Sequence, residues 1–146
     1  KYPDQYAKLK EDPGLIPNMV SETIRWQTPL SFMRRTALED VTIRGKTIKK
    51  GEQIAMWYVS GNRDETFWDQ DPNDFIIDRK NARQHLSFGF GIHRCVGNRL
   101  AELQLRILWE ELMARYEHIE VLAEPSYTSG AFVRGYTWMP VVLHPK

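Results

Sequence analysis

The length and composition of this chain fit one domain of ordinary size. It has 146 residues, of which 42% are hydrophobic, so it can bury one core and is too short for two domains to be expected. The formal net charge of +1 argues against a general polyanion binder, and no nucleic-acid partner is expected. The longest apolar run is far too short to cross a bilayer, so we expect no membrane span and a cytoplasmic location.

The first strong pattern is a helix that begins near Pro17. Its apolar side carries Met19, Val20 and Ile24. The helix must end before Pro29, because a proline disfavours helical geometry in the residue that precedes it.

Short strands and a long loop are predicted next. Residues 33–58 contain short runs rich in Thr, Ile and Val, broken at residues 44–45 and 49–51, a pattern typical of small hairpin strands. Residues 60–84 are crowded with Asp, Asn and Arg, which predicts an irregular loop. The loop also has apolar side chains that we expect to pin it to the core, namely Phe67, Trp68, Phe75 and Ile76.

A long helix and a last hairpin are predicted for the rest of the chain. The helix runs from just after Cys95 to about Tyr116, and opposite charges three and four residues apart should pair on its polar side. Its broad apolar arc, which predicts a mostly buried helix, consists of Leu100, Leu103, Leu105, Ile107, Leu108 and Leu112. Residues 125–145 contain two glycines and a Val-Val-Leu run, which predicts a final hairpin.

The only cysteine, Cys95, lies in a glycine-rich loop that leads into this helix. One cysteine excludes an internal disulfide, so its chemistry depends on its neighbours. A position just before a helix favours the thiolate through the helix dipole and unpaired N–H groups. Three glycines, expected to allow positive φ angles and a close wrap of backbone around the sulfur, are Gly89, Gly91 and Gly97.

This loop resembles the haem-binding signature of the cytochrome P450 family. The five positions of the signature are filled by Phe88, Gly91, His93, Cys95 and Gly97. The resemblance implies a haem b whose iron is bound by Cys95, with Phe88 packed on the loop and His93 donating a hydrogen bond to a propionate. The same residues allow two alternative sites, a zinc site of His85, His93 and Cys95 and a Cys-His nucleophile. The zinc spacing matches no common motif, and a spacing of two residues does not show a base in contact with the thiol.

The same resemblance implies roles for residues outside the cysteine loop. Glu22 and Arg25 are three apart on the first helix, where alone they would be an ordinary surface pair. In the family such a pair is a buried scaffold element, completed by a second arginine from the long loop. Arg79 lies at the matching place, although Ile77 and Asp78 before it depart from the usual pattern. Arg35 matches a propionate-binding arginine. The residues implied to face substrate are Leu30, Phe32 and Phe132.

The resemblance also implies a fold and a function. We expect a mainly α chain with small β-sheets (α+β), in which residues 1–146 are the C-terminal, haem-ligating part of an incomplete P450 fold. The family's N-terminal part, with its oxygen-activating helix, is missing here, so the fragment alone is expected to be inactive. The full-length enzyme would be a monooxygenase that uses O2 to hydroxylate a small apolar substrate.

The details of this expected activity come from the soluble bacterial class I members. The sequence resembles their alkane and fatty-acid terminal hydroxylase branch most, particularly over residues 94–102. Electrons would come from NAD(P)H through a ferredoxin reductase and a ferredoxin. The alternative function is a haem-binding or sensing module without oxygenase activity.

Overall fold

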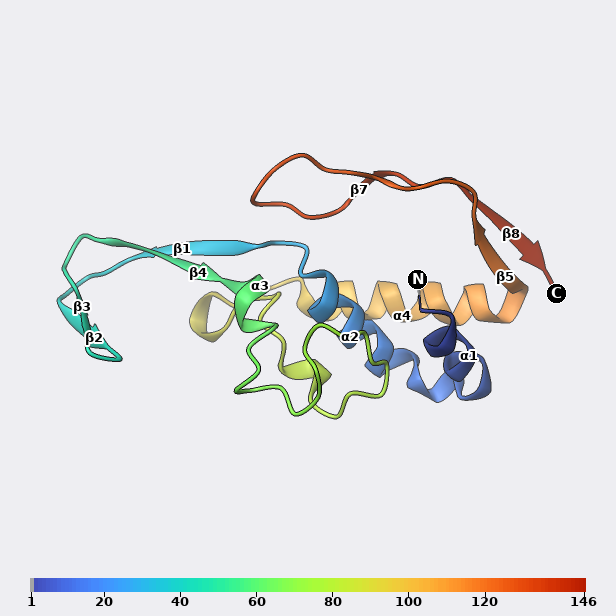
Figure 1. Ribbon diagram of the computed structural model, residues 1–146, viewed down its shortest axis with the longest axis horizontal. Helices are drawn as coiled ribbons and strands as arrows, with labels where there is room; N and C mark the ends of the chain where they lie inside the picture. Colours follow the sequence, from blue (N-terminus) through green and yellow to red (C-terminus); the bar gives the residue numbers. More distant parts are fainter. Residues whose placement is uncertain (1) are drawn as a thin grey trace.

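The computed structural model describes residues 2–146 and is mainly helical, with four two-stranded antiparallel sheets (Figure 1). The α-helices are α1 (Pro3–Glu11), α2 (Ile16–Gln27), α3 (Tyr58–Gly61) and α4 (Asn98–Arg115). The strands are β1 (Phe32–Thr36), β2 (Val41–Ile43), β3 (Lys46–Ile48), β4 (Gln53–Trp57), β5 (Tyr116–Val121), β6 (Ser126–Tyr127), β7 (Tyr136–Trp138) and β8 (Val141–Pro145). Short 3-10 turns cover Pro13–Leu15, Ala82–Gln84 and Gly91–His93. This confirms the predicted fold class.

Helix α2 forms where its apolar spacing and its prolines predict it. Pro17 lies in the first turn, where its missing N–H costs nothing, and the helix ends at Gln27. Thr28 then takes a left-handed backbone conformation with φ of 44°, which is rare for a β-branched residue. Its hydroxyl donates a 2.6 Å hydrogen bond to the Arg25 carbonyl. Local hydrogen bonding therefore supports this strained end of the helix.

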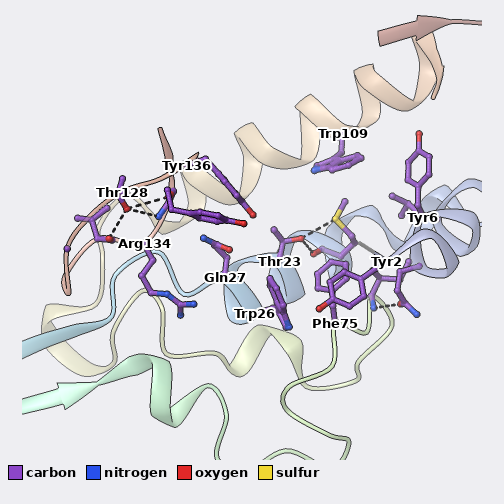
Figure 2. A pocket seen from close by; sticks show the side chains of 18 residues that line it. Tyr2, Tyr6, Thr23, Trp26, Gln27, Phe75, Trp109, Thr128, Arg134 and Tyr136 are labelled. Carbon is purple, nitrogen blue, oxygen red and sulfur yellow. Dashed lines mark hydrogen bonds between the residues drawn. The ribbon is translucent and has the colours of Figure 1, made fainter. Parts of the chain in front are cut away.

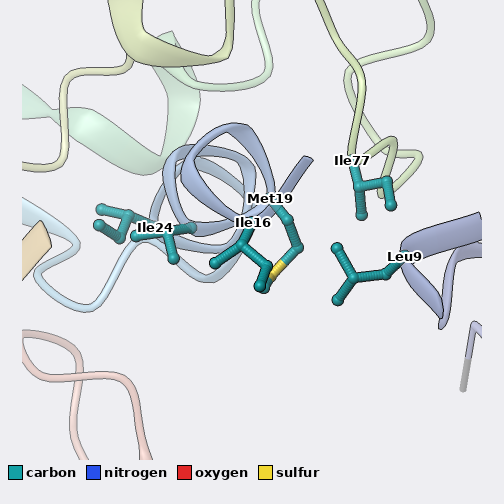
Figure 3. Packing of buried hydrophobic residues seen from close by; sticks show 6 residues of the cluster. Leu9, Ile16, Met19, Ile24 and Ile77 are labelled. Atoms are coloured by element: carbon teal, nitrogen blue, oxygen red, sulfur yellow. The ribbon is translucent and has the colours of Figure 1, made fainter. Parts of the chain in front are cut away.

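The core lies where α1, α2, the long loop and one side of α4 meet. Figure 3 shows Leu9 of α1 and Ile77 of the loop close to the apolar side of α2. The buried cluster consists of Leu9, Ile16, Met19, Val20, Ile24 and Ile77. Burying an aliphatic side chain of this size contributes about 1.5–3 kcal/mol. The partly buried side chains Leu105, Trp109 and Met113 bring α4 against this cluster.

The strands predicted for residues 33–58 are confirmed, in a more detailed arrangement. Strand β1 pairs with β4 in the register Phe32 with Trp57, and a separate hairpin of β2 and β3 extends from their far end (Figure 1). Arg44 and Gly45, at the tip of that hairpin, have φ angles of 47° and 76°. Two consecutive positive φ angles are the conformation that a tight two-residue hairpin turn requires.

The predicted final hairpin is present, although without the Val-Val-Leu run, whereas the prediction of a mostly buried long helix was wrong. The Val-Val-Leu run lies in β8, which pairs with β5 and not with the strand before it, while β6 and β7 form the hairpin. Helix α4 has its predicted length, but within residues 2–146 only one side of it packs, and none of its residues is buried. Four of the predicted apolar positions remain exposed, namely Leu100, Leu103, Ile107 and Leu108.

The long loop is pinned to the core by two of the predicted residues, Trp68 and Phe75, and by Ile77, which was not predicted. Trp68 and Ile77 are buried, whereas the Phe67 side chain is half exposed. The Trp68 indole donates a 3.1 Å hydrogen bond to the Gly61 carbonyl, so it is held at its polar edge as well. Within residues 2–146, no helix is long and apolar enough to cross a membrane.

Candidate functional site

Cys95 lies on the wall of an open cavity of about 850 Å³. The cavity is formed by the end of α2, the segment into β1, the cysteine loop and the first turns of α4. Its apolar lining includes Ile24, Leu30, Met33, Phe88, Ala101 and Leu105. Its basic lining residues are Arg35, His93 and Arg94. A volume of this size and a largely apolar lining with a few polar groups are typical of ligand sites.

The cysteine loop has the backbone geometry that a close wrap requires at two of its three glycines. Gly89 and Gly91 have φ angles of 73° and 76°, in the left-handed region. A side chain at Gly89 would also place its Cβ 3.1 Å from the Tyr58 hydroxyl. Gly97 differs from the prediction, because its φ of −87° is open to any residue. A Cβ there would lie 3.9 Å from the Cys95 sulfur, an ordinary contact distance.

The thiol and the apolar side chains next to it are accessible. Cys95 is exposed, and Ile92 and Val96 are 97% and 101% exposed. The Cys95 N–H donates a 2.8 Å hydrogen bond to the Phe88 carbonyl, which closes the loop beneath the sulfur. A flat apolar macrocycle with two carboxylates fits this wall, because it would cover the apolar side chains and meet basic groups at the rim.

The predicted ion pair is brought together with Arg79, and all three side chains are fully buried. Arg25 donates to both oxygens of Glu22, at 2.6 Å from Nε and 2.8 Å from Nη2, while Arg79 Nε donates to Oε1 at 3.2 Å. The two guanidinium groups also donate to loop carbonyls, those of Asn62, Gln70, Asp71, Pro72 and Asp74. The cluster therefore ties α2 to the long loop through its backbone.

The predicted substrate residues are only partly brought to the cavity. Leu30 lines it, whereas Phe32 and Phe132 contact each other with ring centroids 5.5 Å apart and are not among the lining side chains. Phe32 also packs on Trp57 at 4.8 Å. Arg35 lines the cavity, while its neighbour Arg34 points to solvent and donates to Gln53.

Sequence reasoning missed the buried polar residues behind the loop. His85 is almost fully buried, and its Nδ1 accepts a 3.2 Å hydrogen bond from the Ser87 N–H. Its Nε2 is buried without a partner among the described residues. Burial, together with the nearby charges of Arg94 and Arg25, lowers the pKa of His85 to about 4. His85 is therefore neutral at pH 7, with the proton on Nε2.

We expect His85 to make the protein less stable in acid. The unfolded chain takes up the His85 proton near pH 6.5 and the folded chain only near pH 4, so the free energy of unfolding falls as the pH is lowered between these values. The loss should amount to about 3 kcal/mol. Urea unfolding at pH 7 and pH 4.5 measures it. The difference in unfolding free energy between the two pH values should shrink in His85→Asn and persist in the exposed control His144→Asn. Equal pH dependence in both variants would contradict this prediction.

A second cavity, of about 710 Å³, lies on the other side of α2, between α1, α4 and the β6–β7 hairpin. Figure 2 shows that Trp109 of α4, Tyr6 of α1 and Tyr136 of β7 point toward it. Cys95 does not line it.

The part of the chain that the structure describes contains no group of three or more His, Cys, Asp or Glu residues that could together hold a metal ion. This finding removes the geometric basis of a zinc site made by His85, His93 and Cys95.

Comparisons with known proteins agree with this geometry. A sequence model of the cytochrome P450 family matches residues 5–133. The linalool 8-monooxygenase of Pseudomonas putida is 41% identical over 144 residues, which are 99% of this chain and 35% of that protein. A methyl-branched lipid omega-hydroxylase of Mycobacterium tuberculosis is 36% identical over 143 residues, 97% of this chain and 33% of that protein. The solved structure of cytochrome P450-153 from Novosphingobium aromaticivorans is 50% identical, with a TM-score of 0.92, and the match covers 100% of this chain and 36% of that one.

A cysteine loop on the wall of an apolar cavity, together with a buried Glu-Arg-Arg cluster, fits the haem-thiolate class of proteins. The chain belongs to the cytochrome P450 family, whose cofactor is a haem with its iron bound by a cysteine thiolate. It spans about a third of the length of the relatives that it matches.

Proposed function

We propose that this chain supplies the haem-ligating part of a monooxygenase that hydroxylates unactivated C–H bonds with O2. The observation that carries the proposal is Cys95, exposed on the wall of an apolar cavity in a loop where Gly89 and Gly91 adopt positive φ angles. A thiolate-bound haem supplies the chemistry of O–O cleavage. Cys95 would bind the iron, while the apolar lining would exclude water from the side of the cofactor that it covers.

Arg35 and His93 would hold the cofactor's carboxylates, because both line the cavity near its cysteine wall. We expect Arg35→Gln to weaken haem binding by about tenfold, the effect of losing one charge-assisted hydrogen bond. Transfer of haem to a competing haem-binding protein measures this change. Arg34→Gln is the matched control, since Arg34 lies next in the chain but is exposed and bonded to Gln53. Equal haem loss from the two variants would argue against a carboxylate site at Arg35.

The remaining two thirds of the domain would come from an N-terminal part of the same protein. Relatives about three times as long support this proposal, and so do the apolar side chains that α4 leaves exposed, including Leu103, Ile107 and Leu108. That part would complete the oxygen-activating side of the site, so the 146-residue chain by itself would not turn over. A monodisperse 146-residue monomer with monooxygenase activity would contradict this proposal.

The proposed substrate is a linear alkane or fatty acid, oxidised at the chain end. Support comes from the apolar cavity side chains Leu30 and Met33 and from the omega-hydroxylase name of one relative. Phe32 and Phe132, stacked beside this wall, would border the substrate when the domain is complete. Incubating the full-length enzyme with O2, reductant and either dodecane or a fatty acid tests the proposal. Terminal alcohols are expected; oxidation of a terpenoid alone would refute the substrate class, and haem binding without any product would favour the sensing module.

A ferredoxin, reduced by a ferredoxin reductase with NAD(P)H, is the proposed electron donor. Arg94 and Arg99 are exposed in and just after the cysteine loop, where they can attract an acidic partner. We expect Arg99→Glu to slow reduction by ferredoxin about tenfold at low salt, and much less at high salt because charges are then screened. Stopped-flow reduction measures the rates. The control Arg115→Glu changes an exposed charge at the far end of α4, and equal slowing there would show that the effect is not specific to the arginines near Cys95.

A further inference from the structure

Asn62 lies behind the cysteine loop, in a position that no motif marks. It follows α3 directly, and it is 0% exposed. A fully buried amide is costly unless its donors and its acceptor are paired. The partners of Asn62 therefore show what it holds in place.

The side-chain polar groups of Asn62 and its carbonyl make hydrogen bonds, either to the start of the cysteine loop or to the end of α2. On the loop side, its Oδ1 accepts a 2.7 Å hydrogen bond from the Leu86 N–H, and its Nδ2 donates to Ser87 Oγ at 2.9 Å. On the helix side, Nδ2 donates to Thr28 Oγ1 at 2.9 Å, and the Asn62 carbonyl accepts from Arg25 Nη1 at 2.7 Å. One side chain thus joins the end of α2 to the start of the cysteine loop.

The connection continues from the loop start to Cys95. Ser87 Oγ donates a 2.8 Å hydrogen bond to the Ile24 carbonyl of α2, so Ser87 is fixed from two sides. The next residue, Phe88, accepts the N–H of Cys95 through its carbonyl at 2.8 Å. Hydrogen bonds, joined by the backbone between Ser87 and Phe88, therefore connect the buried Glu22–Arg25 pair through Asn62 to the backbone of the cysteine.

This arrangement makes the position of the cysteine loop relative to α2 depend on Asn62. Shifting residues 86–88 by even half an ångström would stretch the bonds at Leu86 and Ser87 together, because one amide makes both. The same amide supports Thr28 in its left-handed conformation, which also fixes where the chain leaves α2 toward the cavity. Among residues 2–146, no other side chain makes hydrogen bonds to Thr28, Leu86 and Ser87 at once.

We propose that Asn62 is a positioning residue that sets the place of the Cys95 sulfur against the cofactor by coupling the buried Glu22–Arg25 pair to residues 86–88. The proposal rests on the proposed haem-thiolate function. Asn62 does not line the cavity of Cys95, so it would act through the backbone that carries the thiolate. The cost of losing it should therefore appear in the ligation of the iron and not only in the stability of the fold.

The test uses haem-loaded protein and the optical band of its reduced, carbon-monoxide-bound form, which lies far to the red only while a thiolate binds the iron. Asn62→Asp is nearly isosteric, keeps the acceptor for Leu86 and removes the donors to Ser87 and Thr28. We expect conversion of the red-shifted band to the unshifted band to become about tenfold faster, because the bond to Ser87 is the donated bond that reaches the cysteine loop, and losing one buried hydrogen bond changes a rate or equilibrium by about this factor. Unfolding in urea, measured on the same samples, separates this effect from a loss of stability.

The matched control is Asn18→Asp. Asn18 Nδ2 also donates to two carbonyls, those of Ile77 and Arg79, but it has no bond to the cysteine loop. At similar unfolding free energies, Asn18→Asp should convert at the wild-type rate. Equal conversion in the Asn18 and Asn62 variants, or wild-type conversion in both, would overturn the inference.

A milder variant covers the case in which Asn62→Asp does not fold. Ser87→Ala removes only the hydroxyl between Asn62 and Ile24, and it should speed the conversion in the same direction; a wild-type rate would overturn the inference. Where both variants fold, their effects should be less than additive in the double variant, because they break one connection. If the wild-type protein binds haem and never shows the red-shifted band, the proposed function itself fails.

Discussion

Replacing Cys95 with histidine is expected to abolish the red-shifted band of the reduced, carbon-monoxide-bound protein while leaving haem in place. Imidazole is a good ligand for haem iron, so the variant keeps a metal-binding group at position 95. It removes only the anionic sulfur, whose electron donation shifts the band and supports O–O cleavage. We expect monooxygenase activity of the full-length enzyme to fall by at least about a thousandfold, since this one group carries the chemistry.

The spectrum and the haem content decide this prediction together. Pyridine-haem analysis should give the same haem content for the variant and the wild-type protein, so that loss of the band is not loss of cofactor. Ser60→Ala, a change of one exposed hydroxyl on α3, is the control and should leave the band unchanged. A red-shifted band that persists in Cys95→His would show that another group binds the iron, and the assignment of the site would be wrong.

Replacing Glu22 with glutamine is expected to cost about 3–5 kcal/mol of unfolding free energy, because it leaves two buried guanidinium groups without a counter-charge. Arg25 and Arg79 both donate to the Glu22 carboxylate, and all three side chains are 0% exposed. A single domain is stable by only about 5–15 kcal/mol, so the variant should be close to unfolding at room temperature. Expression at low temperature and urea unfolding of the full-length protein measure the change.

An exposed ion pair on α4 is the control for this prediction. Glu111 pairs with Arg115 one helical turn later, where both side chains are more than half exposed to water. Glu111→Gln should change the unfolding free energy by less than about 1 kcal/mol, since solvent screens such pairs. A Glu22→Gln protein as stable as Glu111→Gln would mean that the loop carbonyls alone satisfy the two arginines.

The same cluster shows how far the sequence could predict this site. The resemblance of the cysteine loop placed Cys95, His93 and Phe88, and the three-residue spacing placed Glu22 and Arg25 on one face of a helix. Arg79 was chosen by resemblance in spite of an altered motif around it, and the structure places its guanidinium 3.2 Å from Glu22. The partners that complete the cluster are backbone carbonyls of the long loop, which have no signature in a sequence.

Asn62 and His85 illustrate what a linear pattern could not indicate. Each is one of many polar residues in an irregular segment, and each becomes important only because the fold buries it. The hydrogen bonds of Asn62 join residues as far as 37 positions apart in the chain. No periodicity or spacing predicts such a contact, because loops have neither the period of a helix nor that of a strand.

The sequence by itself determined the local features of this protein: the limits of α2 through Pro17 and Pro29, the tight turn at Arg44 and Gly45, and a cysteine loop of a recognisable haem-thiolate type. Short-range sterics and side-chain chemistry act within a few residues, so these features can be recognised in the linear order. Only the tertiary structure decided that β8 pairs with β5, that α4 packs on one side alone, and that Asn62 connects the ion pair to the cysteine. Those outcomes depend on burial and on long-range pairing, whose free energy arises only when distant segments meet.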